Sequence, residues 1–406
     1  MENYLVVSLI LVWSFSLQRS YAAAESDLHF KLSSGEEISC VPIYEQPSLK
    51  SLVHLKIPKS IPSKKSAEEQ STQVIPDEKE IKLAEQTFKS EVGTCPEGMI
   101  PILRNQPPIR RTRGGFRQGV DSSHGDFQHT FTVNTSEADP ANLHATATHE
   151  YALVSTGGGL YRGAKGFFNV WKPYVELPSE FSLSQLWIAA GSSAENNVNT
   201  IEVGWQVYNN NYKDDFPHLF VLWTRDGYKS TGCYNLRCPG FVQISQSVVV
   251  GGSLASAVSQ TDGPQYELQV IVFWDRGTDA WWLNANREFI GYWPNSLFTA
   301  LKGGATVVQW GGEIINSETG SRHTQTDMGS GEFAEAGWQK AAYIRSLQTV
   351  TSTPEQVFVN VPLATSTVSS TKDKCYSAQI FQDSSSGAWR TYLYFGGPGY
   401  STACPT

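Results

Sequence analysis

The stretch Thr200–Asn210, TIEVGWQVYNN, has the alternating pattern of a β-strand with one buried face. Its apolar side chains occupy every second position: Ile201, Val203, Trp205 and Val207. The other face begins with the carboxylate of Glu202 and continues with Gly204, Gln206 and Tyr208. An isolated Glu on such a strand is most often a solvated residue on an outer face. The remainder of the sequence favours a different interpretation of Glu202.

Similar strand patterns recur along the chain from about residue 129 to its end, with turn residues between them. The clearest are GFFNVWKPY, FSLSQLWIAAG, LFVLWTRDGY, GFVQIS, YELQVIVFWD, AWWLNANREFIGYWP and ATVVQWGGEII. Helical periodicity is scarce there, and PNSLFTALK is the best candidate for a short helix. Many short strands with alternating faces predict an all-β fold, an antiparallel β-sandwich of two sheets, preceded by a small mixed propeptide.

Composition agrees with an aromatic-cored β protein. The chain has 406 residues, of which 12% are aromatic and only 17% are charged, and it contains 34 Gly. Its formal net charge of -8 argues against nucleic acid or an anionic membrane as a partner.

The N-terminus has the features of a secretory signal peptide, although its first residues include no Lys or Arg. Leu5–Leu17, LVVSLILVWSFSL, is an apolar run of suitable length, and YAAAES supplies an A-x-A cleavage site at Ala22 and Ala24. We therefore predict a signal peptide over residues 1–24 and a secreted, extracellular protein, with the vacuole or the cell wall as alternative destinations. A short membrane anchor is the competing interpretation, but the apolar run is brief for a span.

Secretion predicts that the six cysteines are oxidised. Their spacing favours Cys40–Cys95, Cys233–Cys238 and Cys375–Cys404, although sequence alone leaves the connectivity open. Zinc is the alternative, but C-x4-C without a second nearby Cys or His pair is a weak metal signal. The sequon NTS at Asn134 predicts an N-glycosylated surface loop.

Residues 25–128 differ in amino-acid composition from the rest of the chain. They are rich in Lys, Glu, Ser and Pro, with a helix expected around residues 78–92. The basic stretch 96–126 then resembles an exposed linker, where proteases cut. We predict a propeptide over residues 25–128, with an uncertain boundary, and a catalytic domain over 129–406. An accessory N-terminal domain is the alternative.

The sequence does not match several common catalytic and cofactor-binding motifs. GGGLYRGAKG lacks the order of a phosphate loop and is expected to be a turn. In HATATHE, His144 and His149 are five positions apart and point to opposite faces of a strand, which disfavours zinc. No G-x-S-x-G elbow is present, and disulfides leave no thiol nucleophile. We therefore expect no metal and no cofactor.

A second carboxylate has surroundings like those of Glu202. In VVQWGGEIINS, Glu313 follows Trp310, Gly311 and Gly312. Glycine inside a strand often marks the close approach of a ligand or of another backbone. Two such Glu could face each other on one concave sheet, and paired carboxyls whose environments split their pKa values can serve as acid and base.

At these segments the sequence resembles the neprosin family, plant glutamic endopeptidases that cleave after proline. The matching stretches run in order from Cys95 nearly to the C-terminus: CPEGMIPILR, GAKGFFNVWKP, EFSLSQLWI, IEVGWQV, TGCYNLRCPGFVQI, GYWPNSLF, WGGEIINS, HTQTDMGSGEF and YFGGPG. The resemblance implies a signal peptide, an inhibitory propeptide removed at acidic pH, and a two-sheet catalytic sandwich. It also implies that Glu202 and Glu313 are the catalytic pair, and it makes a proline-containing peptide the substrate and the propeptide the inhibitor.

The remaining site residues follow from position. Gln206 shares a strand face with Glu202 and is a candidate amide donor to substrate or oxyanion, with an ordinary surface Gln as the alternative. Tyr234, in the CYNLRC loop, is a candidate substrate contact. An aromatic pocket would suit proline, but each candidate Trp is individually expected in the core: Trp205, Trp223, Trp281, Trp282 and Trp310.

Two other functions fit the residue types. A glycoside hydrolase can use two Glu on a concave, Trp-lined sheet. A non-catalytic extracellular binding protein is the third reading, and it predicts that substituting either Glu leaves ligand binding intact. Only the family resemblance favours the peptidase.

Overall fold

The structure is a computed structural model that describes residues 28–50, 62, 81–104, 106, 117–119, 130–133, 147–192, 195, 197–317, 322–351, 357–383 and 389–405. The predicted signal peptide, Asn134 and His144 lie outside these residues. No helix in the described part of the chain is long and apolar enough to cross a membrane.

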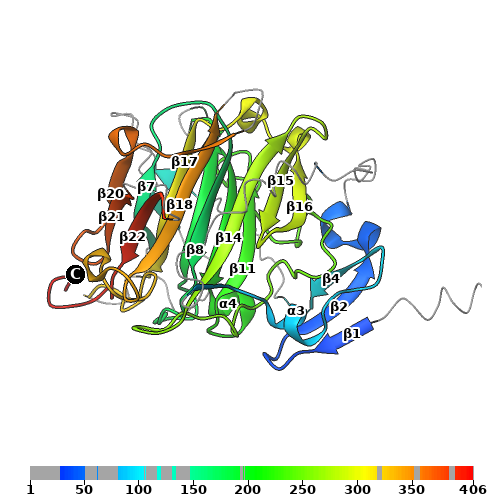
Figure 1. Cartoon of the computed structure of the whole chain (residues 1–406), viewed down its shortest axis with the longest axis horizontal. Coiled ribbons are helices and arrows are strands. Elements are labelled where there is room, and N and C mark those ends of the chain that lie inside the picture. The colour runs from blue at the N-terminus through cyan, green and yellow to red at the C-terminus, as the bar shows by residue number, and fades with distance from the viewer. Residues whose placement is uncertain are drawn as a thin grey trace, which may run out of the picture.

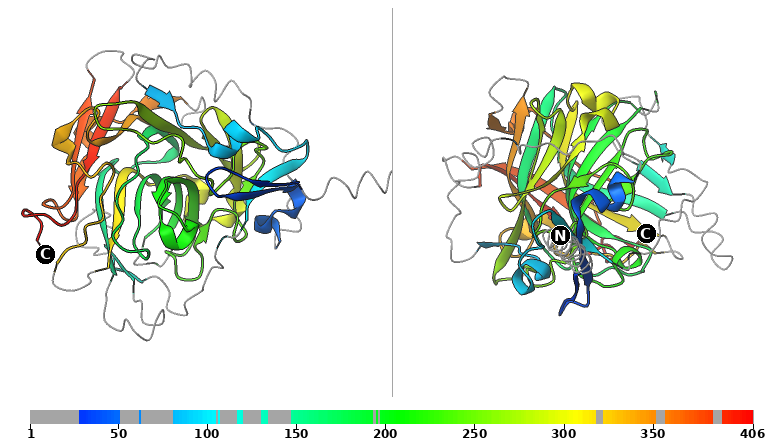
Figure 2. Two further views of the ribbon diagram at one scale, coloured as in Figure 1. Left: turned by 90° about the horizontal axis from the view of Figure 1, so that it is seen from below. Right: turned by 90° about the vertical axis from the view of Figure 1, so that its right-hand side faces the viewer.

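Two large sheets form a sandwich (Figure 1; Figure 2), which confirms the predicted fold class. The nine-stranded sheet has the order β12 (Cys233–Tyr234), β11 (His218–Thr224), β10 (Asn199–Val207), β9 (Ser182–Ala190), β17 (Val307–Asn316), β7 (Ala147–Ser155), β6 (Thr130–Val133) and β5 (Arg117–Gly119). Its remaining strand, β20 (Thr367–Ser370), also pairs with β7.

The ten-stranded sheet has the order β13 (Val242–Gln243), β16 (Glu288–Pro294), β15 (Ala280–Ala285), β14 (Gln265–Asp275), β8 (Tyr161–Asn169), β18 (Ala342–Thr351), β22 (Thr391–Gly396) and β21 (Ser377–Gln382). Two short strands complete it: β19 (Phe358–Asn360) pairs with β18, and β3 (Ile81–Leu83) pairs with β14. The β3–β14 pair is parallel, whereas the other pairs among the described strands are antiparallel.

The main core lies between the two sheets. The apolar face of β10 enters it as predicted, with Ile201, Val203, Trp205 and Val207. Of the five candidate Trp residues, Trp282 alone belongs to a different cluster, packed with Tyr292 and Phe289. The expectation that these Trp residues serve as core packing is therefore met, and none of the five lines the face that carries Glu202.

Helices are few and short in the described residues. They are α3 (Thr87–Glu91), α4 (Asn209–Tyr212) and the 3-10 turns Ile43–Glu45, Pro47–Leu49, Asn295–Leu297, Ala300–Gly303, Ala334–Ala336 and Leu363–Thr365. The helix expected around residues 78–92 is mostly wrong, because Ile81–Leu83 pairs with β14 and only Thr87–Glu91 is helical. A marginal apolar stripe stabilises an isolated helix weakly, so pairing with a sheet prevails. The segment PNSLFTALK forms two 3-10 turns.

The turn expected at GGGLYRGAKG is half correct. Gly157–Leu160 is irregular, but Tyr161 begins β8, the strand at the centre of the ten-stranded sheet. The glycines in this part of the strand are explained by packing, since a Cβ at Gly163 would lie 2.9 Å from Phe273 Cβ on β14.

Three disulfides join the cysteines in the predicted pairs, Cys40–Cys95, Cys233–Cys238 and Cys375–Cys404. The first ties β2 (Glu37–Pro42) to the segment before β4 (Met99–Leu103), and these two strands form a small sheet with β1 (Leu28–Lys31).

This N-terminal sheet lies at one end of the sandwich (Figure 1). Buried polar contacts of the segments next to this sheet attach the N-terminal region there: the Gln86 amide, at the start of α3, donates to Val249 O at 2.8 Å and to Gly252 O at 3.1 Å. The Gln46 amide likewise donates to Gln243 O at 3.1 Å. Both β3 and β5 lie within the predicted propeptide of residues 25–128, yet each pairs with a strand of the large sheets.

The tight approach of β9 and β10 makes Gly204 sensitive to any side chain. A Cβ there would lie 1.9 Å from Ser184 O and 2.7 Å from Gln185 Cα. We expect Gly204→Ala to lower the free energy of unfolding by about 1–3 kcal/mol, measured by urea denaturation. The matched control is Gly303→Ala, because nothing lies within 4 Å of its Cβ position. Equal stability of the two variants would contradict the packing argument.

Candidate active site

The outer face of the nine-stranded sheet carries Glu202 and Glu313. Strand alternation puts Ile201 and Val203 in the core, so Glu202 between them points away from it. On β17, Trp310 and Ile314 enter the same core, and Glu313 also points outward. Neither carboxyl faces bulk solvent, because Glu202 is 4% and Glu313 is 5% exposed.

Gln185 on β9 lies between the two acidic strands. The register pairs it with Gly204 on β10 and with Gly311 on β17. Its side chain is therefore flanked on both sides by positions without side chains. A Cβ at Gly204 would come within 2.8 Å of Gln185 Cβ, so this glycine accommodates the neighbouring strand.

The Gln185 amide joins the two carboxylates. Its Nε2 donates to Glu202 Oε2 at 3.2 Å and to Glu313 Oε2 at 3.3 Å. An amide nitrogen has two hydrogens, and both are directed at acidic oxygens here. The two Glu, about 110 positions apart in the sequence, thus share one hydrogen-bonded site in the structure.

Hydroxyl groups surround Glu202. Thr200 Oγ1 donates to Glu202 Oε1 at 2.7 Å, and the Tyr228 hydroxyl donates to the same oxygen. Burial raises the pKa of Glu202 to about 7, the charge of Glu313 adds to the rise, and these hydrogen bonds oppose it. Below about pH 7, the Glu202 carboxyl is therefore mostly protonated.

A histidine contacts Glu313. His149 Nδ1 lies 2.5 Å from Glu313 Oε1, and both side chains are almost fully buried. Tyr151, two residues further along β7, lies on the same face. Burial and the charge of Glu313 raise the pKa of Tyr151 well above its usual value, so its phenol stays neutral.

Apolar and aromatic side chains enclose the carboxylates. This cluster on the outer face consists of Tyr151, Leu153, Phe181, Leu183, Trp187, Phe220, Tyr228 and Ile315, with Tyr208, Leu222 and Tyr234 at its margin. Trp187 is directly opposite Glu202 across β9 and β10, and its ring meets that of Tyr151 edge-on with centroids 6.3 Å apart. Such surroundings exclude water and strengthen electrostatic effects on anything bound there.

The structure places the predicted site residues as follows. Glu202 and Glu313 come together, but their catalytic roles stay a prediction. Gln206 and Tyr234 also lie on this face, where Gln206 Nε2 donates to the Tyr234 hydroxyl at 3.5 Å. Among the described residues, neither hydrogen-bonds to Glu202 or Glu313, so both stay candidates for substrate contact.

Sequence reasoning missed four polar neighbours of the carboxylates: Gln185, His149, Thr200 and Tyr228. Gln185 had a signal, since it is the one polar residue among Phe181, Leu183 and Trp187 on its strand face. His149 was considered only as a zinc ligand with His144. Tyr228 follows β11 in a turn with φ of 63°, so no strand pattern could place it.

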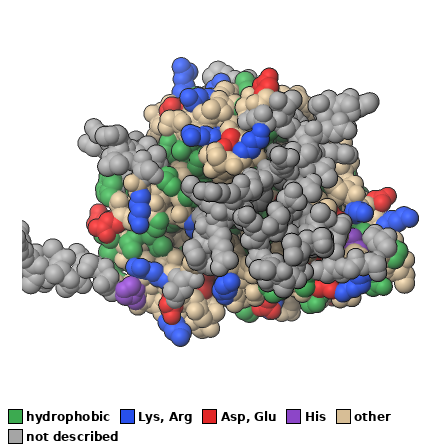
Figure 3. All heavy atoms as spheres, turned by 180° about the vertical axis from the view of Figure 1, so that it is seen from behind, with side chains coloured by type: hydrophobic (Ala, Val, Ile, Leu, Met, Phe, Trp, Pro, Cys, Tyr) green, Lys and Arg blue, Asp and Glu red, His purple; other side chains and the backbone are tan. Residues whose placement is uncertain are grey.

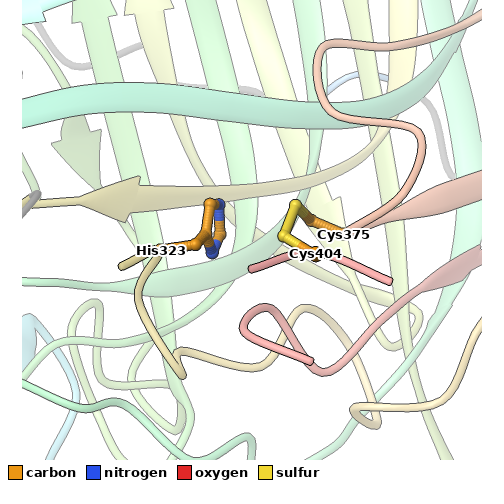
Figure 4. Close-up of side chains that lie close together, drawn as sticks. All are labelled: His323, Cys375 and Cys404. Atoms are coloured by element: carbon orange, nitrogen blue, oxygen red, sulfur yellow. A yellow bond between two sulfur atoms is a disulfide. The ribbon is translucent and has the colours of Figure 1, made fainter. Parts of the chain in front are cut away.

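A second histidine lies beside a disulfide (Figure 4). The side chains of His323, Cys375 and Cys404 approach closely, but both sulfurs are bonded to each other. Both imidazole nitrogens of His323 are also engaged, Nε2 with Glu150 Oε2 at 2.8 Å and Nδ1 with Thr324 O at 2.8 Å. This group is therefore a structural cluster, with no ligand atoms left for a metal.

Charged side chains of the described surface do not gather into a basic patch on the face seen in Figure 3, where Lys and Arg are scattered and Asp and Glu lie among them. This distribution offers no electrostatic footprint for nucleic acid on the part of that face that the structure describes.

Comparison with known proteins identifies one family. The sequence model of the family described as Neprosin matches residues 178–398, which is more than half of the chain. This range contains Glu202, Glu313 and Gln185.

Solved structures give weaker similarities. The chain is similar to Scytalido-glutamic peptidase with a peptide-based transition state analog, at 9% identity and a TM-score of 0.31, covering 63% of this chain and 100% of that chain. It is similar to SCP-B, a member of the Eqolisin family of peptidases in a complex with the tripeptide Ala-Ile-His, at 7% identity and a TM-score of 0.30. The match covers 62% of this chain and 98% of that chain. It is also similar to a GH16 protein of a Bacteroides ovatus mixed-linkage glucan locus in complex with its G4G4G3G product, at 9% identity and a TM-score of 0.26. The match covers 52% of this chain and 79% of that chain.

The raised pKa of Glu202 predicts a pH-dependent stability. A carboxyl whose pKa rises from 4.5 to about 7 on folding holds its proton in the native state between these values. Its stabilising contribution is full below pH 4.5 and is lost as the pH rises through about 7.

Because glutamine does not titrate, we expect Glu202→Gln to gain stability relative to the wild type as the pH rises. The gain between about pH 4.5 and about pH 8 should reach up to about 3 kcal/mol in urea denaturation. Glu332→Gln, which alters an exposed carboxylate, is the control. If the free energies of unfolding of Glu202→Gln and the wild type differed by the same amount at both pH values, the raised pKa of Glu202 would be contradicted.

Proposed function

The chain belongs to the neprosin family, and from this membership, which supports a peptidase, we propose that it is a secreted glutamic endopeptidase that hydrolyses peptide bonds after proline at acidic pH. One observation carries the proposal: the amide of Gln185 donates to Glu202 and to Glu313, so two buried carboxyl groups share one site. Two adjoining carboxyls, one protonated and one ionised, are a known arrangement for acid–base hydrolysis.

The proposed mechanism needs no covalent intermediate. The ionised Glu takes one proton from a water molecule as the water oxygen attacks the carbonyl carbon of the scissile bond. The protonated Glu hydrogen-bonds the carbonyl oxygen while negative charge develops on it, and then gives its proton to the leaving amine. One water molecule is consumed, the C–N bond breaks, and a proton moved between the two Glu restores the starting state.

Acidic pH follows from this chemistry. Two carboxyls in one site cannot both ionise easily, and the pKa of about 7 for Glu202 keeps one proton in the site over the acidic range. Activity should therefore decline as the pH rises through about 7, where that proton is lost.

Preference for proline is supported by the surroundings of the carboxylates. The aromatic rings of Trp187, Tyr151 and Phe181 pack next to the carboxyl pair, and a prolyl ring is itself rigid and apolar. Proline loses little conformational freedom on binding, which favours its recognition by packing alone.

We further propose that the enzyme is made as a zymogen inhibited by residues 25–128. Support comes from Gln106, whose Oε1 accepts a hydrogen bond of 2.6 Å from Arg237 Nε. Arg237 belongs to the loop closed by Cys233–Cys238, which also holds Tyr234 at the margin of the aromatic cluster. The predicted propeptide thus reaches the loop next to the proposed substrate site, and it should be cut away when the secreted chain meets acid.

The test is an activation assay on the secreted full-length chain across pH 3 to 7 with a proline-containing peptide. We expect the wild type to lose its N-terminal segment at low pH and then to cleave the peptide after proline. Glu202→Gln and Glu313→Gln should each lower kcat by about 100-fold or more. The control Glu332→Gln, an exposed carboxylate of the same domain, should match the wild type.

Other outcomes separate the remaining functions. A wild type that releases sugars from a plant polysaccharide but leaves the peptide intact would identify a glycoside hydrolase. Peptide binding without cleavage, unchanged in both Glu variants, would identify a binding protein. Cleavage at bonds other than those after proline, mapped by the masses of the fragments, would leave the peptidase and remove its proposed specificity.

A further inference from the structure

The mechanism above uses two carboxyls and leaves the buried histidine beside them without a role. His149 is 7% exposed, and its Nδ1 lies 2.5 Å from Glu313 Oε1. Burying an imidazole and a carboxylate is costly unless the two are paired, so the contact is a strong constraint on both side chains.

The imidazole is held in place from several sides. On β17, Ile315 is directly opposite His149, and Glu313 is opposite Tyr151. The rings of Phe181 and Tyr151 pack against the imidazole, with centroids 5.7 Å and 6.5 Å from it.

The strand beneath His149 is fixed from its other face. Glu150 points into the sandwich, where His323 Nε2 lies 2.8 Å from Glu150 Oε2 and Asn316 Nδ2 donates to Glu150 Oε1 at 3.1 Å. Because Asn316 belongs to β17, its hydrogen bond to Glu150 also ties β7 to the strand that carries Glu313. The position of His149 relative to Glu313 is therefore set by contacts on both faces of the sheet.

The charges around the two carboxyls are unequal. Among the described residues, the titratable groups facing His149 are Glu313 on β17 and Tyr151 on its own strand, with Glu202 and Tyr228 on the far side of Gln185. Glu313 therefore faces an imidazole that can carry a positive charge, whereas Glu202 faces the neutral hydroxyls of Thr200 and Tyr228. A nearby cation favours the ionised form of a carboxyl.

We propose that His149 is a positioning residue that holds Glu313 as the ionised member of the pair, so that Glu313 is the general base and Glu202 is the general acid. The inference rests on the proposed function for its chemistry. His149 forms and breaks no bond to substrate. It orients the Glu313 carboxylate through Nδ1 and places beside it a ring that can carry a positive charge.

The test compares His149→Gln with the wild type after acid activation of the full chain. Glutamine keeps an amide donor but has no charge. We expect the acid limb of the kcat profile to move upward by about 1 to 3 pH units, because Glu313 then accepts a proton more readily. KM should change little, since His149 contacts Glu313 rather than the peptide.

His218→Gln is the matched control. His218 is also a buried histidine beside a carboxylate, with Nε2 2.9 Å from Asp214 Oδ1, but its ring nitrogens contact Asp214 and the Gly251 carbonyl instead of Glu202 or Glu313. His218→Gln should leave the acid and alkaline limbs of the kcat–pH profile at the same pH as in the wild type. If His149→Gln lowered kcat by the same factor at every pH, His149 would serve structure alone and the proposal would be overturned.

A second measurement does not depend on activity. The ring signal of His149 in histidine-labelled protein is identified by its loss in His149→Gln. We expect Glu313→Gln to move the pH at which this signal changes to a lower value, and Glu202→Gln to move it much less. Equal effects of the two Glu variants would overturn the assignment of the base, even in a protein without peptidase activity. Absence of any activity in the wild type would instead overturn the proposed function.

Discussion

The register of β9 between β10 and β17 is the constraint on which the site depends. Gln185 is opposite Gly204 on one side and Gly311 on the other, and this alignment lets one amide reach both carboxylates. A slip of one residue on either neighbouring strand would turn its Glu into the sandwich core, because strand faces alternate with a period of two. Dense apolar packing between the sheets prevents such a slip, so the core that holds the fold also sets the spacing of the carboxyl pair.

The buried carboxyl pair lowers the stability of the folded protein, as is common for residues kept for function. Two carboxyls are buried on one face, where they repel each other when both are ionised and where each loses its hydration. Hydrogen bonds from Gln185, Thr200 and Tyr228 recover only part of the loss for Glu202, as its pKa of about 7 indicates. A fully buried pair elsewhere, Arg345 with Glu267, is satisfied by two 2.6 Å contacts and a Tyr343 hydroxyl, which is the arrangement expected of a structural ion pair. The contrast favours a chemical role for Glu202 and Glu313.

The sequence predicted those features that depend on local pattern. The alternation in Thr200–Val207 identified a half-buried strand, and similar runs identified most strands of the sandwich core. Features set by long-range pairing were missed. The segment Ile81–Leu83 has no strong strand signal and becomes a strand because it pairs with Gln265–Glu267, the part of β14 that extends beyond its pairing with β15. Gln185 stands out in the sequence only as the polar residue on an otherwise apolar strand face. Neither Gln185 nor His149 could be assigned to the site, because that assignment depends on which strands neighbour β9 and β7, which a single sequence does not give.

The dipeptide His149–Glu150 shows how strand geometry can combine two roles. Consecutive side chains on β7 point to opposite faces, so one residue meets Glu313 in the site while the next meets His323 inside the sandwich. Each pair joins a histidine to a glutamate, but their surroundings differ. Burial lowers the pKa of His323, yet its hydrogen bonds to Glu150 and to the Thr324 carbonyl outweigh this and raise the pKa overall, which fits a fixed structural cation. The outer pair stands next to Glu202, a second carboxyl with a raised pKa, so it is the pair that is placed to take part in the proposed proton transfers. The inner pair fixes the strand, and the outer pair can then act on the chemistry without moving the sheet.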